Sequence, residues 1–470
     1  MIHNNSYIQL LTLLFFLILQ SCARKEESQG KILYDQQCVR CHIGPDIEDL
    51  PKNIWKEGVL PDMGARMGFN TPGYDPYKGF SFEDKLAIMK TNIFPSTPVI
   101  SEEEWIVLQE YILSKAPDSL PETEKPERMN SSLELFDTRP VKLDENPGSY
   151  ITYLEYLPEE NKLAIGDIQN NLKMYDFKSN QFVRTVRGSS PVIKYNKFKG
   201  KEYITQIGRL NPSEIPAGSL STLENDQVKS FNVKLHRPVY SSVGDLDKDG
   251  SPEFVLSEFG HFTGKLSLLK HQGDSILNKT LLNKPGTIRT LIRDMNNDGK
   301  DDIIALTSQG DENITIMYQN ESMEFNREKV IRFSPIYGSS WFELMDYDQD
   351  GDLDIATVHG DNADKTPILK PYHGLRIHIN DGDNNFKESF FYPLDGATRV
   401  VARDFEQDGD IDFALIATFP DYEEDPMRSF VYLENKNQQG YEFTSSTFEA
   451  VNEARWFLMD AGDIDGDGDL

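Results

Sequence analysis

From about residue 142 onward, short apolar runs alternate with polar turns, and each run has the length of a β-strand. Early examples are residues 150–154, 162–167 and 172–176. Four later runs directly follow acidic turns, at residues 254–256, 303–306, 355–358 and 413–416. Many short strands separated by turns predict an all-β domain over residues 142–470.

The acidic turns repeat one pattern, in which polar or acidic residues alternate, Gly follows, and a further carboxylate stands eight residues after the first. The four full copies are Asp245, Asp247, Asp249 and Glu253; Asp294, Asn296, Asp298 and Asp302; Asp346, Asp348, Asp350 and Asp354; and Asp404, Glu406, Asp408 and Asp412. A fifth copy starts with Asp463, Asp465 and Asp467, and its last acidic position would follow Leu470. The copies start 49, 52, 58 and 59 residues apart, which is typical of four-stranded propeller blades.

Each loop offers a shell of hard oxygen ligands, because side chains at alternate positions converge as the backbone coils and Gly permits the sharp turn. An apolar strand follows instead of a helix, so the loops are not EF-hands. They resemble the FG-GAP/VCBS repeats of integrin-alpha-type propellers, and this resemblance implies up to five bound Ca²⁺. The alternative is a set of Asp-rich turns without metal.

The predicted propeller contains about seven blades. Residues 142–235 lack the acidic loop but keep strand-like runs, and we expect two degenerate blades there. Four repeats with full loops follow, and the fifth loop begins a last, truncated blade. The propeller over residues 142–470 is therefore predicted to be incomplete at the C-terminus.

Residues 30–116 have helical periodicity and predict a small all-α domain. Gly30, Tyr34 and Cys38 recur every four residues and therefore share one helix face. Ser81 precedes an acidic first turn, and Ser101 with Glu104 forms a capping box, so helices are predicted to begin at both places. After the second cap, one stripe combines Trp105, Leu108, Tyr111 and Ile112.

The segment Cys38-Val39-Arg40-Cys41-His42 is the C-x-x-C-H signature of covalent haem attachment, with His42 as an axial ligand. A thioredoxin-like redox pair would need a surrounding βαβ pattern, and a zinc site would need further Cys or His ligands nearby. The domain resembles class I cytochromes c, in which the first and last helices cross beside one haem c. This resemblance implies an electron carrier.

A Met thioether is expected as the sixth iron ligand, because His42 is the only His of this region. The candidates are Met63, Met67 and Met89. We favour Met63, since Leu60–Gly64 is predicted to form a tight loop bounded by Pro61 and Gly64. Core filling is the alternative role for each Met.

The N-terminus predicts export and lipid anchoring. Residues 10–19 form an apolar run of signal-peptide length. The run ends in Leu19-Gln20-Ser21-Cys22, which resembles the lipobox of bacterial lipoproteins and implies lipidation of Cys22. Residues 1–22 are therefore predicted to be a signal peptide and residues 23–29 a tether. The protein would be held by its lipid at a bacterial membrane, on the periplasmic face or at the cell surface.

Residues 117–141 contain four Pro residues and many charges, which predict a semi-extended linker that lets the helical domain move. Overall the chain carries 77 Asp and Glu against 48 Lys and Arg, a net charge of −29. This excess argues against nucleic acid as a partner and favours bound cations or a basic partner. All three Cys have predicted roles, so none remains for a disulfide.

Three functions are compatible with these patterns. The first is an anchored monohaem cytochrome c that transfers electrons and uses its calcium-stabilised propeller to dock a redox partner protein. The second is a calcium-dependent binding protein for a glycan or a protein, with the haem domain as an accessory. The third is a haem-linked oxidoreductase, for which Glu258, His261, His359 and Asp361 are the polar residues at one end of the ring. An electron carrier is favoured over a substrate-specific enzyme.

Overall fold

The computed structural model describes residues 28–123, 126, 129–130, 132–133, 135–141, 150–273, 275–321, 323–361, 366–437 and 440–470. The predicted signal peptide and lipidation site at Cys22 lie outside these residues. No helix within the described ranges is long and apolar enough to cross a membrane.

The helical part precedes the strands. It contains α2 (Gln29–Gln37), η1 (Ile47–Asp49), α3 (Lys52–Ile54), η2 (Trp55–Val59), α4 (Leu60–Arg66), α5 (Phe82–Thr91) and α6 (Glu102–Lys115). Two of these helices begin at the predicted caps. The Ser81 side chain accepts a hydrogen bond from the Asp84 amide, and Ser101 and Glu104 form both hydrogen bonds of a capping box.

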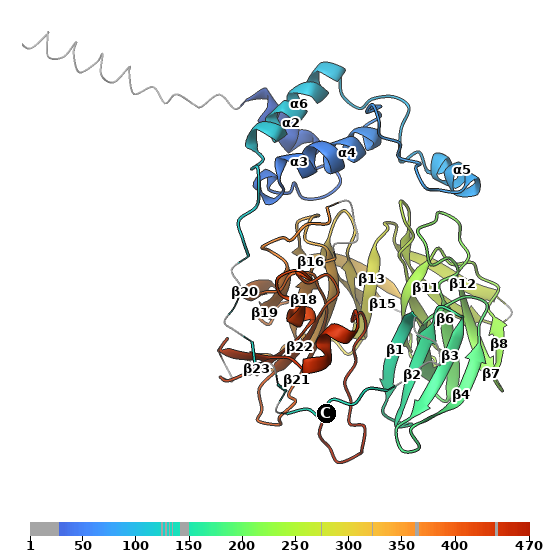
Figure 1. Cartoon of the computed structure of the whole chain (residues 1–470). Coiled ribbons are helices and arrows are strands. Elements are labelled where there is room, and N and C mark those ends of the chain that lie inside the picture. The colour runs from blue at the N-terminus through green and yellow to red at the C-terminus, as the bar shows by residue number, and fades with distance from the viewer. Residues whose placement is uncertain are drawn as a thin grey trace, which may run out of the picture.

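Helices α2 and α6 cross at close range (Figure 1). A Cβ atom added at Gly30 would lie only 2.3 Å from Cβ of Tyr111, so any larger residue at this position would push the helices apart. Trp105, Leu108 and Ile112 of α6 are buried between the helices, which confirms the predicted apolar stripe.

The β part is a propeller whose blades are antiparallel sheets of four consecutive strands. Blade 1 contains β1 (Ile151–Leu157), β2 (Lys162–Asp167), β3 (Asn171–Asp176) and β4 (Gln181–Arg187). Blade 2 contains β5 (Val192–Phe198), β6 (Lys201–Gln206), β7 (Ser219–Glu224) and β8 (Gln227–Ser230). Blade 3 contains β9 (Pro238–Gly244), β10 (Glu253–Glu258), β11 (Lys265–Gln272) and β12 (Ser275–Leu282).

The next three blades follow the same order. Blade 4 contains β13 (Thr287–Arg293), β14 (Asp302–Thr307), β15 (Asn313–Glu321) and β16 (Glu324–Arg332). Blade 5 contains β17 (Ser339–Met345), β18 (Asp354–His359), β19 (Gly374–Asn380) and β20 (Phe386–Pro393). Blade 6 contains β21 (Ala397–Arg403), β22 (Asp412–Ala417), β23 (Phe430–Asn435) and β24 (Phe443–Ser446). Short 3-10 turns at Pro426–Ser429 (η3) and Glu449–Glu453 (η4) flank its outer strands.

The prediction of seven blades is wrong, because the described residues form six sheets. After β24, residues 455–463 run extended without joining a strand ladder in the described part of the chain. Asp460 accepts a hydrogen bond from the Tyr156 amide of blade 1, while Met459 packs against blade 6. This segment thus lies between the first and the last blade, and it leads into the fifth acidic loop.

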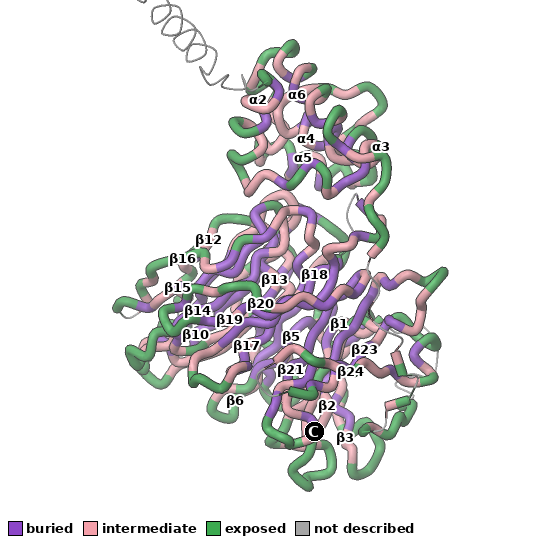
Figure 2. Tube along the Cα trace, turned by 90° about the vertical axis from the view of Figure 1, so that its left-hand side faces the viewer, coloured by how far each residue is buried: buried purple, intermediate pink, exposed green. Residues whose placement is uncertain are grey.

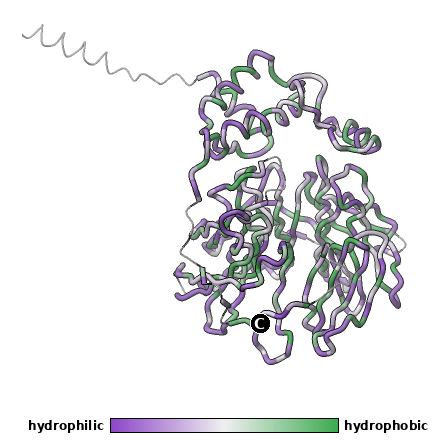
Figure 3. The backbone as a smooth tube through the Cα atoms, in the orientation of Figure 1, coloured by the Kyte–Doolittle hydropathy of each residue, from purple (hydrophilic) through white to green (hydrophobic). Residues whose placement is uncertain are grey.

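The hydrophobic core is divided into layers between neighbouring sheets. One cluster joins blades 5 and 6, another joins blades 4 and 5, and similar clusters join the earlier pairs. The second strands β10, β14, β18 and β22 are buried along their whole length, and Figure 2 shows the continuous buried stretches. Figure 3 shows the matching hydrophobic segments of the chain, separated by hydrophilic ones.

The helical part covers one end of the propeller, and the C-terminus lies at the opposite end (Figures 1 and 2). Ser213 donates a 2.5 Å hydrogen bond to Asp84 of α5. Tyr372 donates to the Asp49 carbonyl, and Phe262 stacks edge-on against Phe94. These propeller residues lie in loops between second and third strands. The acidic loops join first and second strands, so they lie at the end that the helices leave uncovered.

The described residues of the linker pack on blade 6, in contrast to the mobile spacer expected from the sequence. Asn130 forms a parallel bridge with Ser446, and its amide donates to the Ser445 carbonyl at 3.0 Å. Arg428 donates to the Pro126 carbonyl, and Phe136 packs edge-on against Phe405. The linker therefore extends blade 6 locally and ties the helical part to the propeller.

Candidate haem and calcium sites

The C-x-x-C-H segment begins where α2 ends, with Cys38 as the C-cap residue. Cys38 is partly buried against the helical core, whereas Cys41 is exposed, and both are free thiols. Burial, followed by the charge of Asp35, raises the pKa of Cys38 to about 12. A redox-active pair requires a lowered thiol pKa, so this environment argues against a thioredoxin-like role.

The His42 ring is oriented by a 2.7 Å contact between its Nδ1 and the Ile43 carbonyl. A hydrogen bond at Nδ1 is the usual device that leaves Nε2 of a metal-binding His as the ligand atom. The neighbouring turn is held by Tyr34, whose hydroxyl donates to the Pro45 carbonyl. The predicted axial ligand thus lies on a turn that is fixed by its own backbone and by α2.

Met63 lies in helix α4, so the prediction of a tight loop at Leu60–Gly64 is wrong. Pro61 directly follows the π-helical turn η2 within a helical run that is continuous from Lys52 to Arg66, so the change of hydrogen-bond pattern lies just before the Pro. Met63 and Met67 are both partly buried against the cluster that Cys38 also contacts. Met89 is 56% exposed on α5 and does not belong to this cluster. The two Met residues named as leading candidates therefore share the surroundings of the haem-attachment segment.

The acidic loops share one backbone conformation. Lys248, Asn297, Gln349 and Gln407 have φ between 57° and 62°, and the Gly two residues later also has positive φ. The first Asp of each copy, including Asp463, accepts a hydrogen bond from that Gly amide at 2.8–3.2 Å. The last carboxylates, Glu253, Asp302, Asp354 and Asp412, stand at the first positions of β10, β14, β18 and β22. Each of them accepts from the amide of the residue after the first Asp.

The loop of blade 5 presents oxygens that lack a balancing cation. Carboxylate atoms of Asp346, Asp348 and Asp354 lie within 4.8 Å of one another. Oδ1 of Asp346 and Oδ1 of Asp348 are buried and have no hydrogen-bond partner among the described residues. Burial, assisted by the charges of Asp348 and Asp350, raises the pKa of Asp354 to about 6. This donor set fits Ca²⁺, which takes carboxylate oxygens and would neutralise their repulsion.

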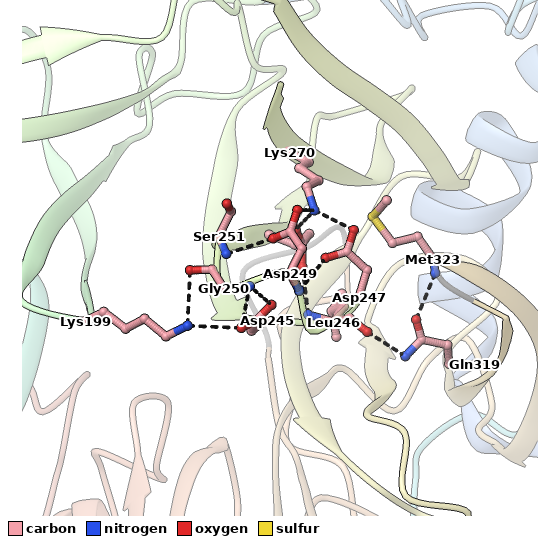
Figure 4. Close-up of polar contacts among 11 residues, drawn as sticks. Lys199, Asp245, Leu246, Asp247, Asp249, Gly250, Ser251, Lys270, Gln319 and Met323 are labelled. Carbon is pink, nitrogen blue, oxygen red and sulfur yellow. Dashed lines mark hydrogen bonds and ion pairs between the residues drawn. The ribbon is translucent and has the colours of Figure 1, made fainter. Parts of the chain in front are cut away.

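The loop of blade 3 already contains a cation from the protein itself (Figure 4). Nζ of Lys270, on β11, lies 2.5 Å from Asp247, 2.6 Å from Asp249 and 2.9 Å from Glu253. The Lys270 side chain is only 5% exposed. Burial would lower its pKa, but the hydrogen bonds to the three carboxylates outweigh burial and raise the pKa above its ordinary value. The ammonium thus occupies the centre of the predicted ligand set, which fits a metal ion less well than the loop of blade 5.

Blade 6 brings together a set of carboxylates that differs from the predicted one. Glu406, Asp410 and Asp412 converge within 4.8 Å, and Oδ1 of Asp410 is buried without a partner. Burial, followed by the charges of Asp408 and Asp412, raises the pKa of Asp410 to about 6. Sequence reasoning missed Asp410, although equivalent loops carry a polar residue directly after the Gly. In the fifth copy, Asp463, Asp465 and Asp467 converge in the same way.

The loop of blade 4 brings no such trio of carboxylates together in the described structure. Asn296 stands at one of its acidic positions and accepts a hydrogen bond from the Asp298 amide. Both oxygens of Asp302 accept backbone hydrogen bonds, from Met295 and Gln319. The same pair of backbone hydrogen bonds holds Asp354 of blade 5, so the loop of blade 4 differs by Asn296, which leaves it with one carboxylate fewer.

Neighbouring acidic loops are joined by side chains at the residue with positive φ. Lys248 donates to the Gly299 carbonyl at 2.6 Å, and Gln349 donates to the Gly409 carbonyl. Gln407 donates to the Gly468 carbonyl at 2.8 Å. Lys199 of blade 2 begins the series by donating to Gly250 at 3.1 Å. The loops are therefore joined in two runs, one from blade 2 to blade 4 and one from blade 5 to the fifth copy, a feature that the repeat pattern did not reveal.

The polar residues considered for an enzyme do not form one site. Glu258 ends β10 in blade 3 and is buried, where it accepts hydrogen bonds from the His236 amide and Ser267. His359 ends β18 in blade 5, and its ring nitrogens contact Ser339 and Thr357. Blade 4 separates them, and each has local structural partners, so the enzyme hypothesis gains no support from them.

The comparisons with known proteins agree with the repeat pattern. Residues 294–357 match the family model of the FG-GAP-like repeat. The matched segment begins at the acidic loop of blade 4 and ends within β18, after the loop of blade 5. The chain thus contains FG-GAP-like repeat sequence within a β-propeller. The comparison with curated proteins finds no match.

Several solved structures resemble the chain at low sequence identity. Kuenenia stuttgartiensis hydrazine synthase has 10% identity and a TM-score of 0.41, covering 63% of this chain and 80% of that chain. The Cps50 (Swd1) beta-propeller domain of Myceliophteria thermophila has 11% identity and a TM-score of 0.37, covering 64% and 90%. The Neurospora crassa Pan2 WD40 domain has 12% identity and a TM-score of 0.39, covering 64% and 79%.

Proposed function

We propose that the protein is a lipid-anchored monohaem c-type cytochrome that transfers electrons, with its propeller as the docking module for a redox partner protein. The observation that carries the proposal is the C-x-x-C-H segment at the end of a helix that crosses α6. Cys38 and Cys41 would hold one haem c through thioethers, and His42 Nε2 would be its axial ligand. The group supplies reversible one-electron chemistry at its iron.

The helix crossing supports this proposal independently of the motif. Gly30 and Cys38 lie on the same side of α2, two helical turns apart, and Gly30 allows contact with Tyr111 of α6. Tyr34 lies between them in sequence, and its ring centroid is 6.3 Å from that of Tyr111. Such a crossing fixes the end of α2, so the attachment residues would be presented from a rigid support.

Met63 is the residue we propose as the sixth ligand, with Met67 as its alternative. Both side chains contact the core cluster that includes Cys38, whereas Met89 points to solvent. A thioether ligand raises the reduction potential of a haem relative to a second His. We therefore expect a carrier of relatively high potential, suited to accept electrons from a donor and pass them to a partner.

The contacts between the propeller and the helical part support a docking role for the propeller. Tyr372 and Ser213 of the propeller anchor the helical part by hydrogen bonds, and Ile336 and Tyr337 of the propeller join the hydrophobic cluster of the helical part. The net charge of −29 favours a basic partner. Ca²⁺ bound in the acidic loops would stabilise this module at the end opposite to the helices. The lipid at Cys22 would hold the assembly at the membrane.

The test is the absorption spectrum of the full-length protein, made in a host that matures c-type cytochromes. We expect a sharp reduced c-type spectrum and haem that resists acid-acetone extraction. Met63→Ala should abolish the sulfur-to-iron charge-transfer band of the oxidised protein, while the matched control Met89→Ala should leave it unchanged. A colourless wild-type protein from a competent host would show that no haem is bound. A charge-transfer band retained in Met63→Ala would indicate Met67 as the sixth ligand.

A further inference from the structure

The first strand of every blade carries an irregularity in its pairing with the second strand. The pairing shifts by one residue near the same point in β1, β5, β9, β13, β17 and β21. The residue that follows this β-bulge lines the central channel in each blade. In order, these residues are Tyr153, Lys194, Tyr240, Arg289, Trp341 and Arg399.

Aromatic and cationic residues alternate around this ring. The Lys194 ammonium lies 5.6 Å from the ring centre of Tyr153 and 5.1 Å from that of Tyr240. The Arg289 guanidinium lies 5.9 Å from Tyr240 and 3.8 Å from Trp341. Each of these distances is within the range of a cation–π contact, so the aromatic rings hold the cations in place inside the channel.

The ring continues through Arg399 to the C-terminal segment. The Arg399 guanidinium lies 4.3 Å from the Trp341 ring centre and 5.1 Å from that of Phe457. Trp341 therefore contacts two guanidinium groups, one from each neighbouring blade. Two like charges beside one indole are unfavourable unless an anion compensates them.

Carboxylates compensate two of the three cations of the ring. Lys194 pairs with Glu155, and Nη2 of Arg289 donates to Glu343 at 2.9 Å. Among the described residues, Arg399 hydrogen-bonds only to a neutral group, since its Nη1 donates to the Thr398 carbonyl at 2.8 Å. The Nε atoms of Arg289 and Arg399 are both buried and have no hydrogen-bond partner in the described part of the chain.

These two Arg residues are 7% and 9% exposed, so bulk water does not satisfy the missing contacts. Burial, followed by the charge of Arg289, lowers the pKa of Arg399 to about 10, and Asp361 acts in the opposite direction. The ring thus carries one cation more than its carboxylate partners, while the wider wall of the channel also includes Asp460, Asp463 and Asp465.

The cavity around the ring has a volume of about 1340 Å³. Pockets for small ligands usually measure about 300–1,000 Å³, so an organic molecule fits with space for water or for a second unit. Its wall combines flat apolar surfaces from Trp341, Tyr240 and Phe457 with the two unsatisfied guanidinium groups.

We propose that the central channel binds an organic carboxylate. The anionic group would accept hydrogen bonds from the guanidinium group of Arg399, the cation of the ring without a carboxylate partner, and a ring-shaped body would pack against Trp341 and Phe457. A single carboxylate matches the single uncompensated charge of the ring. The site depends on neither the haem nor the calcium ions, so its failure would leave the proposed electron transfer intact.

The experiment is isothermal titration calorimetry of the full chain with benzoate and glucuronate, using benzyl alcohol and glucose as neutral counterparts. We expect saturable binding of at least one anion and none of its neutral counterpart. No heat from either anion at about 10 mM, or equal binding of the neutral molecule, would overturn the proposal.

Variants then locate the site. Arg399→Gln should weaken anion binding about ten-fold or more, since it removes a charged donor. Arg327→Gln is the matched control, because Arg327 is exposed on the outer strand β16. Arg399→Lys keeps the charge but loses the guanidinium geometry, and it should also weaken binding. Circular dichroism checks folding of each variant. Unchanged affinity in both folded Arg399 variants would refute the site.

Discussion

The acidic loops of blades 3 and 5 have the same spacing of carboxylates and the same backbone conformation, yet their charges are balanced differently. In blade 3, Lys270 contacts three carboxylates of the loop. In blade 5, Ile379 takes the equivalent position on the third strand, and two buried oxygens of the loop have no partner. The repeat motif therefore specifies the turn, whereas a residue on another strand decides whether the carboxylates of the loop receive a cation from the protein itself.

Removal of calcium should have the largest effect on stability, and it should affect blade 5 but not blade 3. A calcium site contributes roughly 2.7 kcal/mol to the free energy of unfolding when the free calcium concentration is about 100 times its Kd. Chelation by EDTA should therefore lower the Tm by roughly 5 °C or more. Differential scanning calorimetry measures the shift. Hydrogen exchange should show loss of protection in the loop of blade 5 but not in that of blade 3. An unchanged Tm would show that no loop holds calcium.

Replacement of Lys270 by Met should leave the acidic loop of blade 3 without a protein cation, as in blade 5. The variant leaves Asp247 and Glu253 without a cation, and loss of one partner of a buried ion pair costs about 3–5 kcal/mol. Urea unfolding in EDTA measures this loss. Excess calcium should restore part of the stability, because the ion can take the place of the ammonium. Lys279→Met, on the adjacent strand and more exposed, is the control and should change stability by less than about 1 kcal/mol.

Equivalent substitutions in the two loops should differ in their effect on the number of bound calcium ions. Asp348→Asn in blade 5 should reduce the number of bound calcium ions by about one, since it neutralises a ligand with a buried, unpartnered oxygen. Asp247→Asn in blade 3 should leave the number unchanged, because its carboxylate pairs with Lys270. Calcium titration followed by calorimetry distinguishes the two. Equal losses in both variants would contradict the difference between the blades.

Acid should destabilise blade 5 through its histidines, with the smallest expected effect. Burial, followed by Arg376, lowers the pKa of His378 to about 3, below the ordinary value of about 6.5. The unfolded chain therefore binds more protons between these values, and stability is kept above about pH 6.5 and lost as the pH falls. From pH 7.5 to 5.0 the loss is about 2 kcal/mol for one such His. His378→Gln should reduce the drop by that amount in urea unfolding, and an equal drop in both proteins would refute the assignment.

Elements that are determined by residues close together in the sequence were predicted correctly. Ser101 and Glu104 predicted the start of α6 because a capping box is complete within four residues. The acidic loops predicted where β10, β14, β18 and β22 begin, since the last carboxylate and the strand are adjacent in sequence. The four-residue spacing placed Gly30 on one helix face with Tyr34 and Cys38, and the structure identifies Tyr111 as the residue that packs against Gly30.

Features that depend on distant residues were not predictable in the same way. Lys270 lies 17 residues beyond Glu253, and only the pairing of β10 with β11 brings them together. The ring of Tyr153, Lys194 and their counterparts follows from a bulge that recurs without a common residue type. The expected loop at Met63 was wrong because Pro61 lies inside a helical run, directly after the π-helical turn Trp55–Val59. The blade count failed because the fifth acidic loop was counted as the start of a seventh blade, whereas residues 455–463 before it join no sheet of the described structure.

The bridge between Asn130 and Ser446 sets an order of assembly. Asn130 leaves the ribosome early, whereas its partner strand is made some three hundred residues later, which corresponds to roughly 15–60 s of translation. During this interval the helical part can fold but cannot be fastened to blade 6. If the proposed haem is attached within this interval, Cys38 and Cys41 would react on a helical part that is not yet fastened to the propeller.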